Sequence, residues 1–161
     1  MLIILYIIIS IIIYSLAEYV VHRYLMHQRR KPSVQKTRHA LHHFKYYKEF
    51  AGDPDPAAPH ISIELGGPTI LYYSMPLLLI LFALGYNVQG FILGITGVIY
   101  GEFWSFVHLK MHEPSNHWFV STRYFKAMET HHRLHHENPS TNFGAVFLGF
   151  WDIVLGTKYA R

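Results

Sequence analysis

The stretch His131-His132-Arg133-Leu134-His135-His136 places four imidazoles within six residues. It lies in a chain of 161 residues that has 13 histidines and no cysteine. Ten of the histidines form four short clusters: His22/His27, His39/His42/His43, His108/His112 and His132/His135/His136. Histidine is the commonest metal ligand among side chains. Clustering on this scale therefore predicts metal binding, and the lack of cysteine excludes thiolate ligands and disulfides.

Two of the clusters share the spacing His-x-x-His-His, at residues 39–43 and 132–136. Residues four apart on a helix share a face, whereas the inner histidine points in a neighbouring direction. We therefore expect each outer pair to serve one ion and each inner histidine to serve a second. Helical geometry suggests five imidazoles per ion and leaves exchanged members open. The partition it gives is His22, His39, His43, His132 and His136 for one ion, and His27, His42, His108, His112 and His135 for the other.

Residues 1–21 form an apolar run rich in Ile, Leu and Tyr, and residues 1–17 carry no charge. Glu18 marks the water boundary of this run. At about 1.5 Å per residue, a helix of this length can cross about 30 Å of hydrocarbon. A cleaved signal peptide is the alternative interpretation. The chain has no basic residue before this run, and the run passes directly into His22. Both features favour a retained membrane anchor.

A second apolar region, residues 68–107, is broken by the turn sequence 85–90 and predicts a hairpin. Its arms are short for a complete span, so it either crosses a thin region or is re-entrant. Both alternatives return the chain to the side it started from. Basic residues follow the first apolar segment, which places that side in the cytoplasm. All four histidine clusters then lie on one face of the membrane.

The chain is thus expected to be one all-α membrane domain, residues 1–161. It comprises an anchor (1–21), a hairpin (68–107) and a cytosolic metal-binding cap (22–50 and 108–161). Residues 51–67 read as a loop without a phosphate-binding motif. The net charge of +4 comes with no nucleic-acid-binding module, so no nucleic acid is expected as a partner.

Metal-bound imidazoles usually donate their second nitrogen to an acid or a carbonyl. The candidate acids are Glu18, Glu102 and Asp152, and Glu102 is the only acid inside the hairpin. A carboxylate within a membrane segment is costly unless it is used. His117 and His131 are expected to be spectators or to support a ligand, and His60 is expected at the surface.

These motifs together resemble the fatty acid hydroxylase / sterol desaturase superfamily. The resemblance rests on the four histidine clusters, with Arg23 after His22, and on a C-terminal signature. That signature is Asn142-Phe143-Gly144, Trp151-Asp152 and Gly156-Thr157. Carotenoid hydroxylases of the same superfamily have similar histidine clusters. The sequence after the last cluster, from Glu137 to Thr157, looks closer to the fatty acid and sterol branch.

The resemblance implies an integral membrane enzyme with two non-haem iron ions, which uses O2 and two electrons to hydroxylate or desaturate a lipid. Zinc could replace iron in purified samples, since imidazole binds both metals. The chain has no fused haem domain, so a separate electron-transfer protein is expected. The membrane would be the inner membrane in a bacterium or the endoplasmic reticulum in a eukaryote. Two rival classes are a non-catalytic metal-binding or transport protein and a zinc-dependent lipid hydrolase.

Overall fold

The structure is a computed structural model that describes residues 2–27, 34–47, 49–50, 66–113, 115–147 and 149–160. Within these ranges the chain forms helices, turns and irregular segments, and no strand. The all-helical prediction is therefore confirmed for the described part of the chain. Most of the expected loop at 51–67, including His60, lies outside the described residues.

The first helix, α1 (Leu2–Val20), continues into a π-helical turn, η1 (Val21–His27). The combined helix of 26 residues is long and apolar enough to cross a bilayer. The large side chains along its first half, from Leu2 to Ile13, are mostly exposed. A water-soluble helix would bury such a stripe, so this surface suits contact with lipid.

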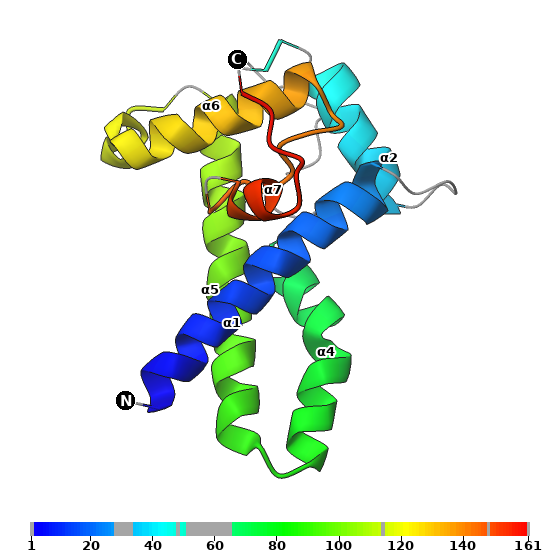
Figure 1. Cartoon of the computed structure of the whole chain (residues 1–161), viewed down its shortest axis with the longest axis vertical. Helices are drawn as coiled ribbons and strands as arrows, with labels where there is room; N and C mark the ends of the chain where they lie inside the picture. The colour runs from blue at the N-terminus through cyan, green and yellow to red at the C-terminus, as the bar shows by residue number, and fades with distance from the viewer. Residues whose placement is uncertain are drawn as a thin grey trace.

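The predicted hairpin consists of α4 (Gly67–Ala83) and α5 (Asn87–His112), with Gly85 at φ 81° in the turn between them. Only α5 is long enough to count as a further candidate membrane span, and α4 is a shorter apolar helix. In Figure 1, α1 crosses this hairpin obliquely, and the hairpin turn points away from the C-terminal part of the chain.

The histidine-bearing elements lie at the other end of the hairpin. They are α2 (Val34–Leu41) with the π-helical turn η2 (His42–Tyr46), then η3 (Trp118–Ser121), α6 (Arg123–Glu137) and the short α7 (Phe150–Val154). Helix α6 begins where the Thr122 hydroxyl accepts a hydrogen bond from the backbone N–H of Phe125 at 3.1 Å. Figure 1 shows α6 lying across the end of α5, with α7 below it beside α1.

Two glycines of α5 allow the three apolar helices to approach closely. A Cβ at Gly97 would lie 2.5 Å from the ring of Tyr14 on α1. A Cβ at Gly101 would lie 2.7 Å from the backbone nitrogen of Gly67, where α4 begins. A larger residue at Gly101 would push the backbones of α4 and α5 apart, whereas one at Gly97 would require the Tyr14 ring to move.

Glu102 lies at the second of these crossings. Its Oε1 accepts a hydrogen bond from the backbone N–H of Gly67 at 2.9 Å. A carboxylate at a helix N-terminus satisfies an N–H that has no partner within the helix and interacts favourably with the helix dipole. The acid inside the hairpin therefore joins α5 to the start of α4, and its side chain is exposed rather than set among the imidazoles.

Replacing Gly101 with Ala is expected to destabilise the protein by about 1–3 kcal/mol, because the added methyl group must push α4 away from α5. The measurement is the unfolding temperature in a mild detergent. Gly94→Ala is the matched control, since a Cβ there would meet only Leu78 at an ordinary 3.8 Å. Equal unfolding temperatures for the two variants would contradict the close crossing.

Candidate metal centre

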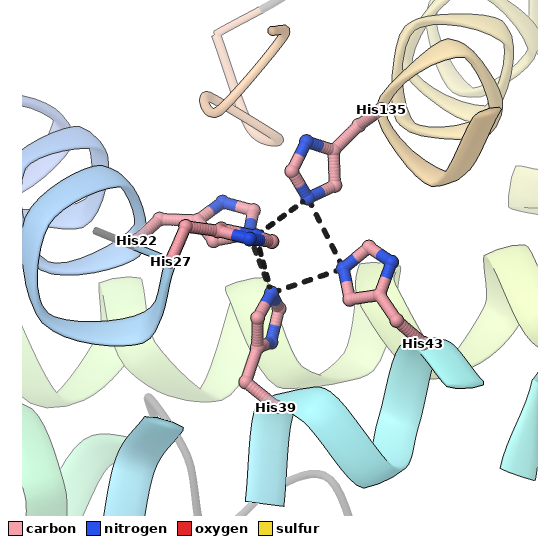
Figure 2. A group of neighbouring side chains, drawn as sticks. All are labelled: His22, His27, His39, His43 and His135. Carbon is pink, nitrogen blue, oxygen red and sulfur yellow. Dashed lines mark hydrogen bonds between the residues drawn. The ribbon is translucent and has the colours of Figure 1, made fainter. Parts of the chain in front are cut away.

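Five imidazoles from η1, α2, η2 and α6 converge at one point. We call them cluster A: His22, His27, His39, His43 and His135. Their ligand nitrogens all lie within 4.8 Å of one another. Nε2 of His39 is 2.8 Å from that of His27 and 3.0 Å from those of His22 and His43. Figure 2 shows the five rings arriving from three helices with these nitrogens turned inward.

Four of the other imidazoles, those of His42, His112, His132 and His136, have ligand nitrogens within 4.8 Å of one another. His108 adjoins this group through His132, and we call the five together cluster B. Nε2 of His132 is 2.9 Å from that of His108 and 3.0 Å from that of His112. Nε2 of His42 is 3.1 Å from that of His136. The clusters are adjacent, since the rings of His43 in A and His136 in B stack with centroids 4.0 Å apart.

The structure groups the ten imidazoles five and five, but with different members from the partition that helical geometry suggested. His27 and His135 join His39 and His43, whereas the 132/136 pair joins His42. The two His-x-x-His-His segments face one another, so the outer pair of each meets the inner histidine of the other. The geometry of a single helix correctly predicts that its outer and inner histidines point in different directions. It does not determine which histidines of the two helices come together.

His22 and His27 were expected to reach one ion each, because five residues on an α-helix leave the two side chains offset. The structure brings them together, with ring centroids 5.1 Å apart. The reason is η1, whose i→i+5 hydrogen bonding stacks residues five apart more nearly over one another than an α-helix does. A second π turn, η2, begins at His42. Nothing in the sequence pattern distinguishes these turns from α-helix.

Backbone carbonyls orient three of the rings. Nδ1 of His22 lies 2.5 Å from the carbonyl oxygen of Phe143, Nδ1 of His135 lies 2.6 Å from that of Thr141, and Nδ1 of His112 lies 2.5 Å from that of Phe50. A carbonyl only accepts, so each of these Nδ1 atoms carries the proton, and each Nε2 presents a lone pair to its cluster. Phe50 has φ 69°, which is rare for a bulky residue and often marks a functional site.

Two of the three predicted acids, Asp152 and Glu18, bind the segment that supplies two of these carbonyls rather than the imidazoles of either cluster. Asp152 accepts hydrogen bonds from the backbone N–H groups of Phe143 and Gly144, both at 2.8 Å, and its Oδ2 lies 3.2 Å from Nε2 of His131. Glu18 accepts from the N–H of Ala145 at 2.5 Å and from the hydroxyl of Tyr100. His131 therefore contacts an acid and belongs to neither cluster, and His117 lies exposed at the start of η3.

Burial determines the electrostatics of the clusters. Loss of solvation, reinforced by the neighbouring imidazoles, lowers the pKa of His42 and His132 well below the usual range and that of His136 to about 2. Burial alone would raise the pKa of Asp152, but hydrogen bonds from His131, Gly144, Thr157 and Phe143 outweigh it and lower that pKa. The imidazoles are thus neutral, which is the form that binds a metal.

The arrangement fits metal ions. Ten neutral imidazoles are gathered here, and among the described residues neither cluster includes a carboxylate. Nδ1 atoms of His42, His43 and His108 are buried without a hydrogen-bond partner. The Nε2 atoms of the same three rings face other Nε2 atoms within the clusters, and facing lone pairs stay under-satisfied until a cation accepts them. Two nitrogens about 2.1 Å from one ion and at right angles would be about 3.0 Å apart, close to the spacings seen here.

Fold and site together define a class: an all-helical protein with candidate membrane helices and two adjacent all-histidine clusters at one end of them. Comparison with protein families then matches residues 7–157 to the model described as "Fatty acid hydroxylase". The chain belongs to this family, as the resemblance implied. Comparisons with curated proteins and with solved structures gave no match.

The crossed grouping can be tested with two double variants loaded with ferrous iron. His43→Ala with His135→Ala removes two members of cluster A and should leave about half of the bound metal as resistant to a chelator as in the wild type. His43→Ala with His136→Ala removes one member from each cluster. No part of the metal bound by this variant should resist the chelator as well as the metal of the wild type does. The readout is metal per chain after dialysis, with His117→Ala as the control. The reverse pattern would favour the partition based on helical geometry.

Replacing Asp152 with Asn should destabilise the protein by about 2–3 kcal/mol, since hydrogen bonds to a charged group are lost. Because the pKa of Asp152 is lowered on folding, this contribution is present above its unfolded pKa and lost as the pH falls through the folded one. The difference in unfolding temperature between wild type and variant should therefore persist at pH 6–7 and shrink toward pH 3.

The matched control for that variant is Glu129→Gln, another acid-to-amide change. Glu129 forms a partly exposed pair with Lys126 on α6 at 3.0 Å, and such pairs contribute little. If Asp152→Asn were no more destabilising than this control, Asp152 would not hold the segment 143–144.

Proposed function

We propose that the chain is an O2-dependent lipid hydroxylase whose two iron ions are held by clusters A and B. The substrate class is a fatty-acyl or sterol-type lipid, and the alternatives are carotenoid hydroxylation or lipid desaturation at the same centre. The observation that carries the proposal is the pair of adjacent five-histidine clusters at one end of apolar helices. Membership of the fatty acid hydroxylase family supports it.

The ligand set supports iron over zinc. Structural zinc prefers four ligands in a tetrahedron, and tetrahedral nitrogens would be about 3.4 Å apart at ordinary bond lengths. Within cluster A, several neighbouring Nε2 atoms lie 2.8–3.1 Å apart and all five ligand nitrogens lie within 4.8 Å, which suits the smaller ligand–metal–ligand angles of five or six ligands. Non-haem iron commonly has such higher coordination with nitrogen ligands.

The reaction has a simple balance. A C–H bond, O2, two electrons and two protons give a C–OH group and one water. When bound, the iron pair activates O2 and so supplies the oxidising power that an unactivated C–H bond requires. The protein supplies fixed imidazole tautomers through the carbonyls of Phe143, Thr141 and Phe50, and a buried site that excludes bulk water.

We place the whole chain in the membrane as one domain. The anchor is residues 1–21, the hairpin is residues 68–107, and the metal-binding cap comprises residues 22–50 and 108–161 on the cytoplasmic side. Candidate spans at Leu2–His27 and Asn87–His112 support the first two assignments. Basic residues after the first segment support the orientation. A separate cytosolic electron-transfer protein would deliver the two electrons, in the inner membrane of a bacterium or the endoplasmic reticulum of a eukaryote.

The test is lipid profiling of cells that express the wild type or His135→Ala. We expect a lipid about 16 mass units heavier than its precursor in the wild type alone, because one oxygen atom is inserted. Loss of two hydrogens instead would indicate desaturation at the same centre. His117→Ala serves as the control and should give the wild-type profile.

A second arm removes oxygen. Hydroxylation should stop in the absence of O2 and resume when it is restored. A lipid product that forms equally well without O2 would exclude an oxygenase and favour the zinc-dependent hydrolase.

A further inference from the structure

The segment 147–155, which contains α7, places its charged and apolar side chains the opposite way round from the surface of a water-soluble protein. Its only charged residue, Asp152, is fully buried. Five of its large apolar side chains are 44–59% exposed: Phe147, Phe150, Ile153, Val154 and Leu155. A buried acid beside a group of exposed large apolar side chains marks a surface that contacts a lipid or another protein.

The contacts on the inner side of α7 hold this arrangement in place. Asp152 accepts hydrogen bonds from the backbone N–H groups of Phe143 and Gly144, both at 2.8 Å. Trp151 donates from Nε1 to the hydroxyl oxygen of Ser15 on α1 at 2.9 Å. The apolar side chains cannot turn inward unless these hydrogen bonds break, so the outer face of α7 stays apolar.

Two contacts locate α7 along α1. Trp151 meets α1 at Ser15, and the Tyr19 hydroxyl lies 3.0 Å from Oγ1 of Thr157. Helix α1 ends at Val20, which is still an exposed apolar residue. At about 1.5 Å per residue, Ser15 is about 8 Å from that end. Helices that lie in a membrane interface bury their apolar face about 5–10 Å into the boundary between headgroups and acyl chains. Helix α7 lies at the level of this boundary.

The apolar surface of α7 also continues into that of the membrane helices. Two hollows border α1. One is an apolar cavity of about 220 Å³ between α1, α4 and α5. The other is a groove of about 410 Å³, whose lining includes Ile11 of α1, Ile99 of α5 and Phe147. Phe147 therefore belongs both to the wall of the groove and to the exposed surface of the segment 147–155. Because the two apolar surfaces join there, the bilayer that surrounds α1 and α5 reaches α7 as well.

The residues that follow α7 suit the edge of a membrane. Lys158 and Tyr159 are both exposed. Tyrosine is enriched at membrane–water interfaces, and a lysine side chain can extend its charge to the headgroups while its stem lies along apolar groups. These two residues fit a position just outside the acyl chains.

We propose that the segment 147–155 is a membrane-interface anchor, with Phe150, Ile153 and Val154 among the acyl chains of the leaflet beside the metal clusters. The partner is the bilayer and not a second protein chain. Part of the C-terminal cap then lies within the membrane. The proposal rests on the membrane placement made above but not on lipid oxidation. Because α7 also carries Asp152, its outer face contacts lipid while its inner face holds the segment whose carbonyl orients His22.

The chain has no cysteine, so one introduced cysteine can carry the only thiol-linked fluorophore. The test places the full chain in phosphatidylcholine nanodiscs with a fluorophore at Ile153→Cys or Phe150→Cys. Thr130→Cys, exposed on α6, is the water control, and Ile8→Cys, exposed on α1, is the membrane control. Iodide quenches a fluorophore in water, and lipids with a nitroxide near the headgroup or near the chain end quench one in the bilayer at the matching depth.

We expect iodide to quench the Ile153 and Phe150 probes at least about threefold less than the Thr130 probe, because the interface shields them. The shallow nitroxide should quench these two probes more than the deep one does, and the order should reverse for the Ile8 probe. Both probes must report on the same face of α7, so agreement between them guards against a local effect of either label.

Two results at α7 would overturn the proposal. Iodide quenching equal to that of the Thr130 probe would mean that the face contacts water. Protection from iodide and from both nitroxide lipids would mean that a second chain covers it. Either result, with the Ile8 probe still quenched by lipid, would leave the membrane placement standing. Failure of lipid to quench the Ile8 probe would overturn that placement and this proposal together.

Discussion

The structure depends on the cost of gathering ten imidazoles side by side, eight of them buried and two, His27 and His136, partly buried. A buried histidine cannot easily hold a charge, so its neutral ring must find both a donor and an acceptor partner. Here Nε2 atoms point at one another, 2.8–3.3 Å apart, and only backbone carbonyls satisfy the Nδ1 protons of His22, His112 and His135. A metal ion removes the conflict between facing lone pairs. The helices are therefore arranged around the centres of clusters A and B, and each centre is lined by histidines from several helices.

The segment Thr141–Ala145 shows how that arrangement is held. It supplies no ligand, yet its carbonyls orient one ring from η1 and one from α6. Asp152 and Glu18 bind its N–H groups, and Asn142 takes the left-handed conformation, φ 54°, that an Asn tolerates. A carboxylate acting through the backbone can fix two imidazoles at once, whereas direct contact would fix one. The C-terminal signature thus has a physical purpose, although it lies outside the histidine boxes.

The sequence was sufficient where a residue's role follows from its own helix. The apolar runs predicted the first helix and the hairpin. The i,i+4 spacing correctly predicted that the outer two histidines of each His-x-x-His-His segment face one cluster and the inner one, His42 or His135, faces the other. It was insufficient wherever two elements meet. The crossed grouping depends on how α2 and α6 face each other, and the pairing of His22 with His27 depends on a π turn. Glu102 was expected near the metals because a carboxylate within a membrane segment is costly unless it is used. It instead accepts a hydrogen bond from the backbone N–H of Gly67, at the start of α4.

Helix α5 connects the membrane part of the chain to the metal site through one stripe of residues. Gly97, Gly101, Trp104 and His108 are spaced by four, three and four residues, so they lie along one face. In order along the helix, this face meets α1 at Tyr14, the start of α4 at Gly67, the apolar cavity and cluster B. A straight helix keeps these distances fixed. The position of the apolar cavity relative to cluster B is therefore set by the same backbone that places His108, and a change in how the helices cross would be transmitted to the candidate metal site.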